Sequence, residues 1–277
     1  MAEQIQIPPG SVTCTTYGSI RGETARCLME MRSFSEEQGL RNCSWDMVPG
    51  GLVEKARNDA VRQMLGRGQQ WILFVDGDMV FGKEALLQLL TFAYAPNSPA
   101  DVVGAYCTLK GDLCLPTIDS GTGTWESVYP GIGPIEVMRT GAAFILAKRH
   151  VFERLPDPWF KMRVPARPVD FMGEVDNWAR MKLNGKNPFR NLPGEPWEKL
   201  EEQARVDPSA HRGNFVPAEV GEDSAFCDAA RNRVIRLFVH TDVIVGHLET
   251  VTKSWTDHKS AMEKMKVQHR QLCGVLS

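Results

Sequence analysis

The sequence predicts an α/β fold in which helices flank a mixed, mostly parallel sheet. Over the first hundred or so residues, β-prone segments alternate with amphipathic helical segments, which is the pattern of a wound sheet. The segment 71–81 begins with five apolar residues in succession, which is typical of a strand buried on both faces. A chain of 277 residues with 43% hydrophobic residues can also form a substantial core.

The first half of the chain gives the clearest pattern. Each expected helix has apolar residues three or four positions apart, and each expected strand is a short β-prone run bounded by Gly, Pro or polar residues. In chain order, the expected elements are strand 11–17, helix 23–38, strand 43–48, helix 52–65, strand 71–81, helix 83–94 and strand 101–107.

The second half is less regular. Segment 111–133 is rich in Gly, Thr and Pro, which predicts loops and a hairpin, and segment 156–221 contains many prolines and is expected to be an irregular insertion. We expect a single domain over 1–250, followed by a C-terminal helical tail over 251–277. The other expected elements are strands 135–138 and 142–146, helices 148–155 and 222–232, and strands 234–239 and 243–245.

Composition narrows the classes of partner and compartment. The formal net charge of -2 gives no electrostatic reason to expect nucleic acid or an anionic membrane as a default partner. The start of the chain is polar and contains prolines, unlike a signal peptide, and no run approaches the roughly 20 apolar residues of a membrane span. Seven scattered cysteines without a CxxC spacing predict reduced, mostly buried thiols and a cytoplasmic protein.

Two carboxylates follow the apolar run of segment 71–81. Asp76 and Asp78 lie two positions apart, so on an extended strand end their side chains would project together, and Gly77 between them would let a ligand approach the backbone. Ligands of open α/β sheets bind beyond the carboxyl ends of the strands. Two hard oxygen anions at such a place predict a divalent cation and a ligand that carries phosphate.

Two further groups of polar residues occur where an element begins or ends. Glu222 and Asp223 open an expected helix, and His247 directly follows an expected strand. Carboxylates together with a histidine suit Mn²⁺ and would accept Mg²⁺, which would stabilise a diphosphate leaving group. Each group also has a purely structural explanation, such as acids that complement a helix dipole or a histidine held in the core.

Four segments together resemble the GT-A glycosyltransferases, in particular the family-two-like and Anp1-like bacterial and phage members. The D-x-D strand of these enzymes resembles WILFVDGDMVF (71–81), and their nucleotide-facing helix resembles GLVEKARNDAV (51–61). Their glycine-containing strand, helix and Pro-Trp-Phe segment resemble VMRTGAAFILAKRHVFERLPDPWF (137–160). Their Glu-Asp helix, closing strand and metal histidine resemble GEDSAFCDAARNRVIRLFVHTDVIVGHL (221–248). The similarity covers residues 12–248.

This resemblance implies a GT-A fold and a reaction. The enzyme would transfer a sugar from a nucleotide-sugar donor, a UDP-sugar, to a hydroxyl acceptor such as a glycan, a small molecule or a modified DNA base. Mn²⁺ or Mg²⁺ would be required, and segment 156–221 would contact the acceptor.

The resemblance also implies functions for individual residues. Asp78 and His247 would bind the metal, and Asp76 would contact the ribose or the metal shell. Asp223 would be the general base of an inverting enzyme, and Glu222 would orient it or touch the sugar. The loop after the first strand lacks the proline usual in the family. The remaining contacts would come from Thr15, Tyr17, Arg57 and Asn58 for the nucleotide, and from the backbone at Thr140 and Gly141 for the sugar.

Two alternatives remain open at this point. Residues 76–80 also fit the D-x-D-x-(Thr/Val) pattern of haloacid dehalogenase-like phosphatases, in which Asp76 would be a nucleophile and Asp223 and Asp228 a late acidic pair. Against this, a strand-helix-strand-helix region precedes the segment, and no middle motif supplies the needed lysine. The second alternative is a non-catalytic GT-A module that binds a sugar or a nucleic acid, for which the only hint is the basic cluster Arg180, Lys182, Lys186 and Arg190.

Two residue groups have two interpretations each. Arg57 would either add a fixed cation to the site or be a solvated charge on its helix. Trp159 and Phe160 would either stack on a sugar or anchor their loop in the core.

Overall fold

The structure, a computed structural model, describes residues 6–16, 19–109, 115–121, 126–161, 166–168, 215–217, 221–248 and 252–253. The chain forms two compact units. The first comprises Met1–Met162 and Gly221–Ser277, and the second comprises Arg163–Val220. In the second unit the described residues form two strands, β10 (Ala166–Pro168) and β11 (Phe215–Pro217), which pair in an antiparallel manner. All the features that follow belong to the first unit.

The first unit begins with alternating strands and helices, as the sequence predicts. Up to residue 107 its elements are β1 (Gly10–Thr16), α1 (Gly22–Glu37), β2 (Cys43–Pro49), α2 (Val53–Gly66), β3 (Trp71–Asp76), β4 (Met79–Phe81), α3 (Ala85–Ala93) and β5 (Val102–Cys107). The later elements are β6 (Ile118–Asp119), β7 (Pro134–Val137), β8 (Arg139–Thr140), β9 (Phe144–Lys148), α4 (Arg149–Arg154), α7 (Glu222–Arg231), β12 (Leu237–Leu248) and β13 (Thr252–Lys253).

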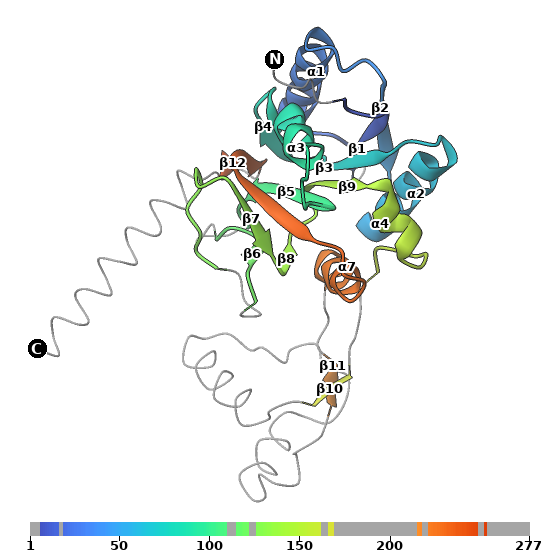
Figure 1. The fold of residues 1–277 in the computed structure, drawn as a ribbon, viewed down its shortest axis with the longest axis vertical. Helices are drawn as coiled ribbons and strands as arrows, with labels where there is room; N and C mark the ends of the chain where they lie inside the picture. The colour runs from blue at the N-terminus through green and yellow to red at the C-terminus, as the bar shows by residue number, and fades with distance from the viewer. Residues whose placement is uncertain are drawn as a thin grey trace, which may run out of the picture. The chain divides into compact units, whose positions relative to one another are not determined.

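The main sheet confirms the predicted mixed, mostly parallel architecture (Figure 1). Its strand order in the described residues is β13-β12-β5-β9-β3-β1-β2, with β4 and β7 paired to β12. β1 is parallel to β2 and β3, and β12 is parallel to β5. Because β3 and β5 are both antiparallel to β9, these five strands share one direction and β9 lies reversed between β3 and β5.

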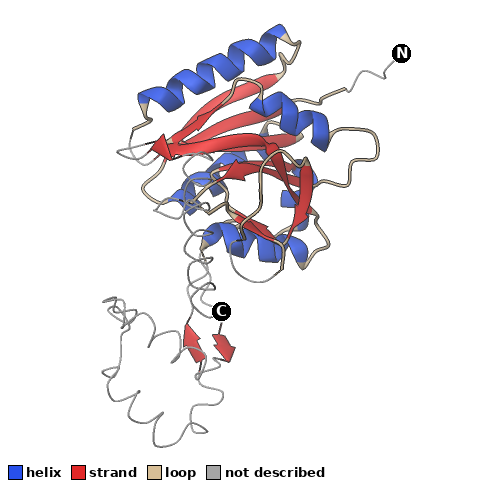
Figure 2. Ribbon diagram, turned by 90° about the vertical axis from the view of Figure 1, so that its left-hand side faces the viewer, coloured by secondary structure: helices blue, strands red, loops and turns tan. Residues whose placement is uncertain are grey.

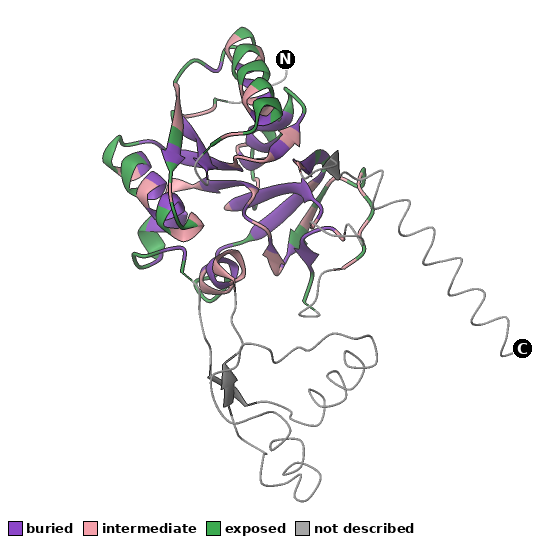
Figure 3. Cartoon of the chain, turned by 180° about the vertical axis from the view of Figure 1, so that it is seen from behind, coloured by how far each residue is buried: buried purple, intermediate pink, exposed green. Residues whose placement is uncertain are grey.

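Helices cover both faces of this sheet (Figure 2). Trp71–Val75 of β3 are all fully buried, which confirms that this strand is enclosed on both sides. Alternate residues of the strand contribute to different cores: Ile72 and Phe74 pack with α2, α4 and α7, whereas Leu73 and its odd-numbered neighbours pack with α1 and α3. The buried residues accordingly concentrate on the strands and the exposed ones on the outer helix surfaces (Figure 3).

The end of the described chain differs from the prediction. The sequence suggested two short strands over 234–239 and 243–245, but β12 is one strand of 12 residues. Its pairing with β5 shifts register between His240 and Ile244, and this irregularity interrupts the apolar pattern that would have indicated one strand. Val234 lies before the strand in a turn, with a φ of 58° and an exposed side chain.

The described cysteines agree with the expectation of mostly buried thiols. Cys14, Cys27, Cys43, Cys107 and Cys227 are all free thiols, and every one except Cys43 is buried. None of the helices in the described ranges combines the length and the apolar character that crossing a membrane requires.

Candidate active site

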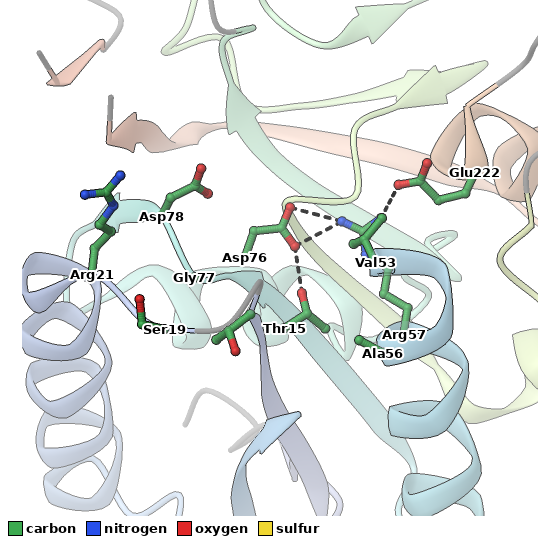
Figure 4. A pocket seen from close by; sticks show the side chains of 11 residues that line it. Thr15, Ser19, Arg21, Val53, Ala56, Arg57, Asp76, Gly77, Asp78 and Glu222 are labelled. Atoms are coloured by element: carbon green, nitrogen blue, oxygen red, sulfur yellow. Dashed lines mark hydrogen bonds and ion pairs between the residues drawn. The ribbon is translucent and has the colours of Figure 1, made fainter. Parts of the chain in front are cut away.

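A cavity of about 530 Å³ lies at the carboxyl ends of β1 and β3. Its volume falls within the range of roughly 300–1,000 Å³ that is common for ligand sites. Three carboxylates and two guanidinium groups line it, so a charged, polar ligand fits it better than an apolar one. The described lining residues are Thr15, Thr16, Ser19, Arg21, Val53, Ala56, Arg57, Asp76, Gly77, Asp78 and Glu222 (Figure 4).

Asp76 and Asp78 both line the cavity, but they do not project from one extended strand end. β3 ends at Asp76, and Asp78 lies in the turn that leads to β4. Figure 4 shows Asp76 directed toward Arg57, whereas Asp78 lies at the other side of the cavity, near Arg21. The expectation of a matched carboxylate pair was therefore wrong in its geometry, because a turn follows Asp76 and ends the alternation of side chains.

Backbone hydrogen bonds connect the turn at Gly77 to the end of β1 and to the residue before α1. The N–H of Gly77 donates to the carbonyl oxygen of Thr15 at 2.9 Å, and the N–H of Arg21 donates to the carbonyl oxygen of Gly77 at 3.0 Å. A Cβ at Gly77 would lie 3.1 Å from Cγ2 of Thr16, so the glycine permits close packing against the end of β1.

Arg57 is a buried cation between two carboxylates. Its side chain is 3% exposed, its Nη2 donates to both oxygens of Asp76 at 3.0 and 3.1 Å, and its Nη1 donates to Oε1 of Glu222 at 2.7 Å. Thr15 donates its hydroxyl to Oδ1 of Asp76 at 2.8 Å. Burial alone would lower the pKa of Arg57, but the charges of Asp76, Glu222 and Asp223 outweigh it and raise that pKa. The interpretation of Arg57 as a solvated helix charge was therefore wrong.

Asn58 is buried beside Arg57 but is not among the described residues that line the cavity. Its Oδ1 accepts hydrogen bonds from the backbone N–H groups of Trp159 and Phe160 at 2.9 and 3.0 Å, and its Nδ2 donates to the carbonyl oxygen of Phe160 at 2.7 Å. The structure thus places Asn58 in hydrogen bonds with the backbone of this loop, and the nucleotide contact implied by the resemblance stays a prediction.

Trp159 and Phe160 anchor their loop in the core, as the second interpretation of these residues expected. They are 8% and 1% exposed. The ring of Phe160 stacks on that of Phe226 in α7, with centroids 4.6 Å apart and an interplanar angle of 17°. The loop therefore links α2 to α7, the two helices that supply Arg57 and Glu222.

Thr140 and Gly141, which the resemblance places at the sugar, pack against other segments of the chain. Neither is among the described residues that line the cavity. Thr140 is 1% exposed, and a Cβ at Gly141 would lie 3.1–3.3 Å from atoms of the Thr117 side chain. Gly141 therefore serves close packing between two segments of the chain, and its backbone is not brought to the cavity by these contacts.

Glu222 and Asp223 occupy the first turn of α7, at the helix end where carboxylates are stabilised by the dipole. Glu222 reaches the cavity, whereas Asp223 is not among the described residues that line it. Oδ1 of Asp223 accepts a hydrogen bond from the backbone N–H of Ser224 at 2.7 Å. Burial, followed by the charge of Glu222, raises the pKa of Asp223 above its ordinary value. A carboxylate with a raised pKa is a better proton acceptor near neutral pH.

His247 is nearly buried in β12, beside the turn that contains Asp78. Its Nδ1 lies 2.8 Å from the carbonyl oxygen of Thr108, which can only accept, so Nδ1 donates this hydrogen bond, and in the neutral imidazole Nε2 is the nitrogen without a proton. A histidine oriented in this way is suited to bind a metal through Nε2. Within the described ranges, no group of three or more His, Cys, Asp or Glu side chains is arranged to hold a metal ion.

The sequence interpretation missed one cation of the site. Arg21 precedes α1, its side chain is exposed, and it lines the cavity on the side of Asp78 (Figure 4). No sequence signal marked it, because an isolated arginine before a helix is ordinary. Several predicted features lie outside the described residues. They are Tyr17, the basic cluster Arg180, Lys182, Lys186 and Arg190, most of the expected acceptor-side segment 156–221, and the expected C-terminal helical tail 251–277 apart from residues 252–253.

Comparison with known proteins gives matches at the level of structure. No protein-family profile matches the chain, and no curated protein sequence matches it significantly. A197 from STIV has a TM-score of 0.48 and 15% identity, over 87% of this chain and 86% of its own. GalNAc-T7, solved with UDP, GalNAc and Mn²⁺, has a TM-score of 0.48 and 10% identity over 88% of this chain, which spans only 44% of the GalNAc-T7 chain.

A third structure is glucosyl-3-phosphoglycerate synthase from Mycobacterium tuberculosis, in complex with Mn²⁺, UDP-glucose and phosphoglyceric acid. Its TM-score is 0.36 at 9% identity, over 75% of this chain and 81% of its own.

Proposed function

We propose that this chain is a metal-dependent glycosyltransferase that moves a sugar from a nucleotide-sugar donor, a UDP-sugar, to a hydroxyl acceptor. The observation that carries the proposal is the cavity at the carboxyl ends of β1 and β3, where Asp76, Asp78, Arg57 and Glu222 meet. This is the edge of an α/β sheet at which nucleotides bind. Its polar, charged lining fits a sugar joined to a diphosphate.

The two sides of the cavity suit the two ends of such a donor. On one side, Asp76 and Thr15 present oxygen atoms that suit the hydroxyl groups of a ribose or a sugar. On the other side, Arg21 offers a guanidinium group in front of Asp78, and a guanidinium can bind phosphate oxygens in a bidentate manner. The donor would thus lie across the Gly77 turn.

Asp78 and Nε2 of His247 are the protein ligands that would hold a divalent cation. A bound Mn²⁺ or Mg²⁺ would neutralise the diphosphate and make it a better leaving group. Two protein ligands suffice when donor phosphates complete the coordination. The hydrogen bond from the backbone N–H of Leu248 to the carbonyl oxygen of Asp78, at 2.6 Å, holds together the two segments that carry these ligands.

Asp223 is the proposed general base. It would accept the proton of the acceptor hydroxyl as the oxygen attacks C1 of the sugar and the bond from C1 to the diphosphate oxygen breaks, so that the nucleoside diphosphate leaves. A sugar hydroxyl is a weak nucleophile at neutral pH, so proton transfer to a nearby carboxylate accelerates the step. The raised pKa of Asp223 suits this role.

The phosphatase alternative is not favoured. Both oxygens of Asp76 accept hydrogen bonds from the Arg57 guanidinium, and one of them also accepts from Thr15, which lowers the nucleophilicity of this carboxylate. Asp228, the second member of the late acidic pair, is held by Nε and Nη2 of Arg139 at 2.7 and 3.0 Å. It is not among the described residues that line the cavity.

The proposal is tested by a screen of nucleotide sugars. We expect one UDP-sugar to raise the melting temperature in the presence of Mn²⁺ and to be slowly hydrolysed, and we expect Asp78→Asn to abolish both effects. Stabilisation without hydrolysis or transfer to any hydroxyl acceptor would instead indicate a non-catalytic binding module. Absence of stabilisation by every nucleotide sugar would refute the proposal.

A further inference from the structure

Arg57 joins three elements that are far apart in the sequence. It belongs to α2, and its guanidinium binds Asp76 at the end of β3 and Glu222 at the start of α7. Figure 4 shows the guanidinium between the two carboxylates, with an interaction to each. The two acids are therefore connected through Arg57.

Both terminal nitrogens of the guanidinium already hold carboxylates. Nη1 is engaged by Glu222, Nη2 is engaged by Asp76, and Nε is buried without a hydrogen-bond partner among the described residues. The face of the guanidinium lies 5.7 Å from the ring centroid of Phe160. A phosphate or a base that took either terminal nitrogen from its carboxylate would leave that carboxylate partly buried without its counter-charge.

We propose that Arg57 is a positioning residue, which fixes Glu222, and with it the first turn of α7 that carries Asp223, relative to Asp76. In this arrangement Glu222 is an anchor and not a contact to the sugar, and Asp223 is left for proton transfer. The functional part of this inference rests on the proposed glycosyl transfer, in which Asp76 contacts the donor and Asp223 the acceptor.

The chemistry of arginine explains why this position needs that side chain. A planar guanidinium presents donors in two directions and can hold one carboxylate on each, whereas a lysine ammonium is a point charge on a flexible stem. Without the guanidinium, the charges of Asp76, Glu222 and Asp223 would also repel one another across a partly buried site. Lysine would therefore keep the charge but lose the fixed distance between β3 and α7.

The first test needs no substrate. Asp76→Asn and Glu222→Gln, alone and combined, are made in the wild type and in the Arg57→Lys background, and thermal unfolding midpoints are measured. We expect the two substitutions to be non-additive in the wild type and additive in the Arg57→Lys background, because Arg57 carries the coupling between them. Arg62→Lys is the matched control: Arg62 is an exposed arginine of the same helix that is paired with Asp59 and Asp157, and its replacement should leave the coupling intact.

The second test measures transfer. For Arg57→Lys we expect kcat to fall by about 100-fold, the effect of misplacing a reacting group by about 1 Å, while the donor KM changes less than about threefold. Glu222→Gln should show the same pattern more weakly. A rise in donor KM with unchanged kcat would assign Arg57 to the donor and overturn the inference.

The two tests separate this inference from the proposed function. If no nucleotide sugar is turned over but the unfolding midpoints are coupled through Arg57, the proposed glycosyl transfer is wrong and the positioning role of Arg57 is supported. If transfer is observed and the effects of the two substitutions on the unfolding midpoint are additive in the wild type, the positioning role of Arg57 is wrong and the proposed function is supported.

Discussion

Leu248 donates its backbone N–H to the carbonyl oxygen of Asp78 at 2.6 Å. The bond extends the antiparallel pairing of β12 with β4, in which His247 lies opposite Met79. The segment that carries the predicted metal-binding aspartate and the segment that carries the predicted metal-binding histidine are therefore neighbouring parts of one sheet. A substitution that shifts either segment is therefore expected to shift the other.

Replacement of the proposed metal ligands should abolish metal-dependent turnover. Asp78→Ala removes a carboxylate and His247→Ala removes Nε2, so each leaves a single protein ligand. The measurement is the initial rate of transfer against Mn²⁺ concentration. His150→Ala, which changes a histidine paired with Asp101, is the control and should behave like the wild type. Near-wild-type activity of either ligand variant in limiting Mn²⁺ would disprove the metal assignment.

Asp223→Asn should separate donor binding from transfer. We expect the donor to stabilise the variant as it does the wild type, while kcat falls by about 10²–10⁴-fold, the usual contribution of a general base. Because transfer needs ionised Asp223, the wild-type kcat should rise with pH through the raised pKa of this group, and the variant should lack that rise. Asp59→Asn, an exposed acid on α2, serves as the control. Loss of donor binding in Asp223→Asn would remove Asp223 from the role of base.

The same residue should limit stability at neutral pH. The pKa of Asp223 is higher in the folded chain than its ordinary value of 3.8, so the folded state holds this proton more tightly than the unfolded state. The resulting stabilisation is complete below that ordinary value and is lost as the pH rises through the folded pKa. Asp223→Asn should therefore melt at a higher temperature than the wild type at pH 7, with a smaller difference at pH 4. An equal difference at both pH values would show that ionisation of Asp223 does not matter for stability.

Asn58→Ala should act on stability. It removes one donor and one acceptor and leaves the backbone groups of Trp159 and Phe160 without partners, so we expect the free energy of unfolding to fall by about 2–4 kcal/mol, as for other buried polar networks. Denaturant titration measures this change. Gln63→Ala, at an exposed position of the same helix, should change it by less than about 0.5 kcal/mol. A variant with normal stability and weakened donor binding would instead support the nucleotide contact that the resemblance implied.

The fold was predictable where local pattern determines it. The continuous apolar run of β3 and the amphipathic faces of α1 and α2 indicate their structure without knowledge of their neighbours. β12 was divided in the prediction because the register shift between His240 and Ile244 breaks its pattern. The reversed direction of β9 has no local signal, since strand direction follows from the path of the connections.

The sequence was sufficient to select the acidic residues of the candidate site, but not to predict which residues contact one another there. Asp76 and Asp78 stand out because they follow a fully apolar run, at the end of a strand where ligands of open α/β sheets bind. The functions of Arg57 and Asn58 depend on partners 165 and about 100 positions later, which helix periodicity cannot reveal. The two adjacent residues consequently have different environments, one between carboxylates at the cavity and the other against the backbone of a loop.

The place of β9 between β3 and β5 has a consequence for the order in which the sheet can assemble. Both neighbours of β5 in the sheet, β9 and β12, come later in the chain than β5 itself. A growing chain that has reached residue 110 thus contains the β2-β1-β3 half of the sheet and an apolar β5 with neither of its partners. Unpaired apolar strands are prone to associate with other chains. The interval of synthesis between β5 and β9 is therefore a period in which an unpaired apolar strand of this protein is exposed to aggregation.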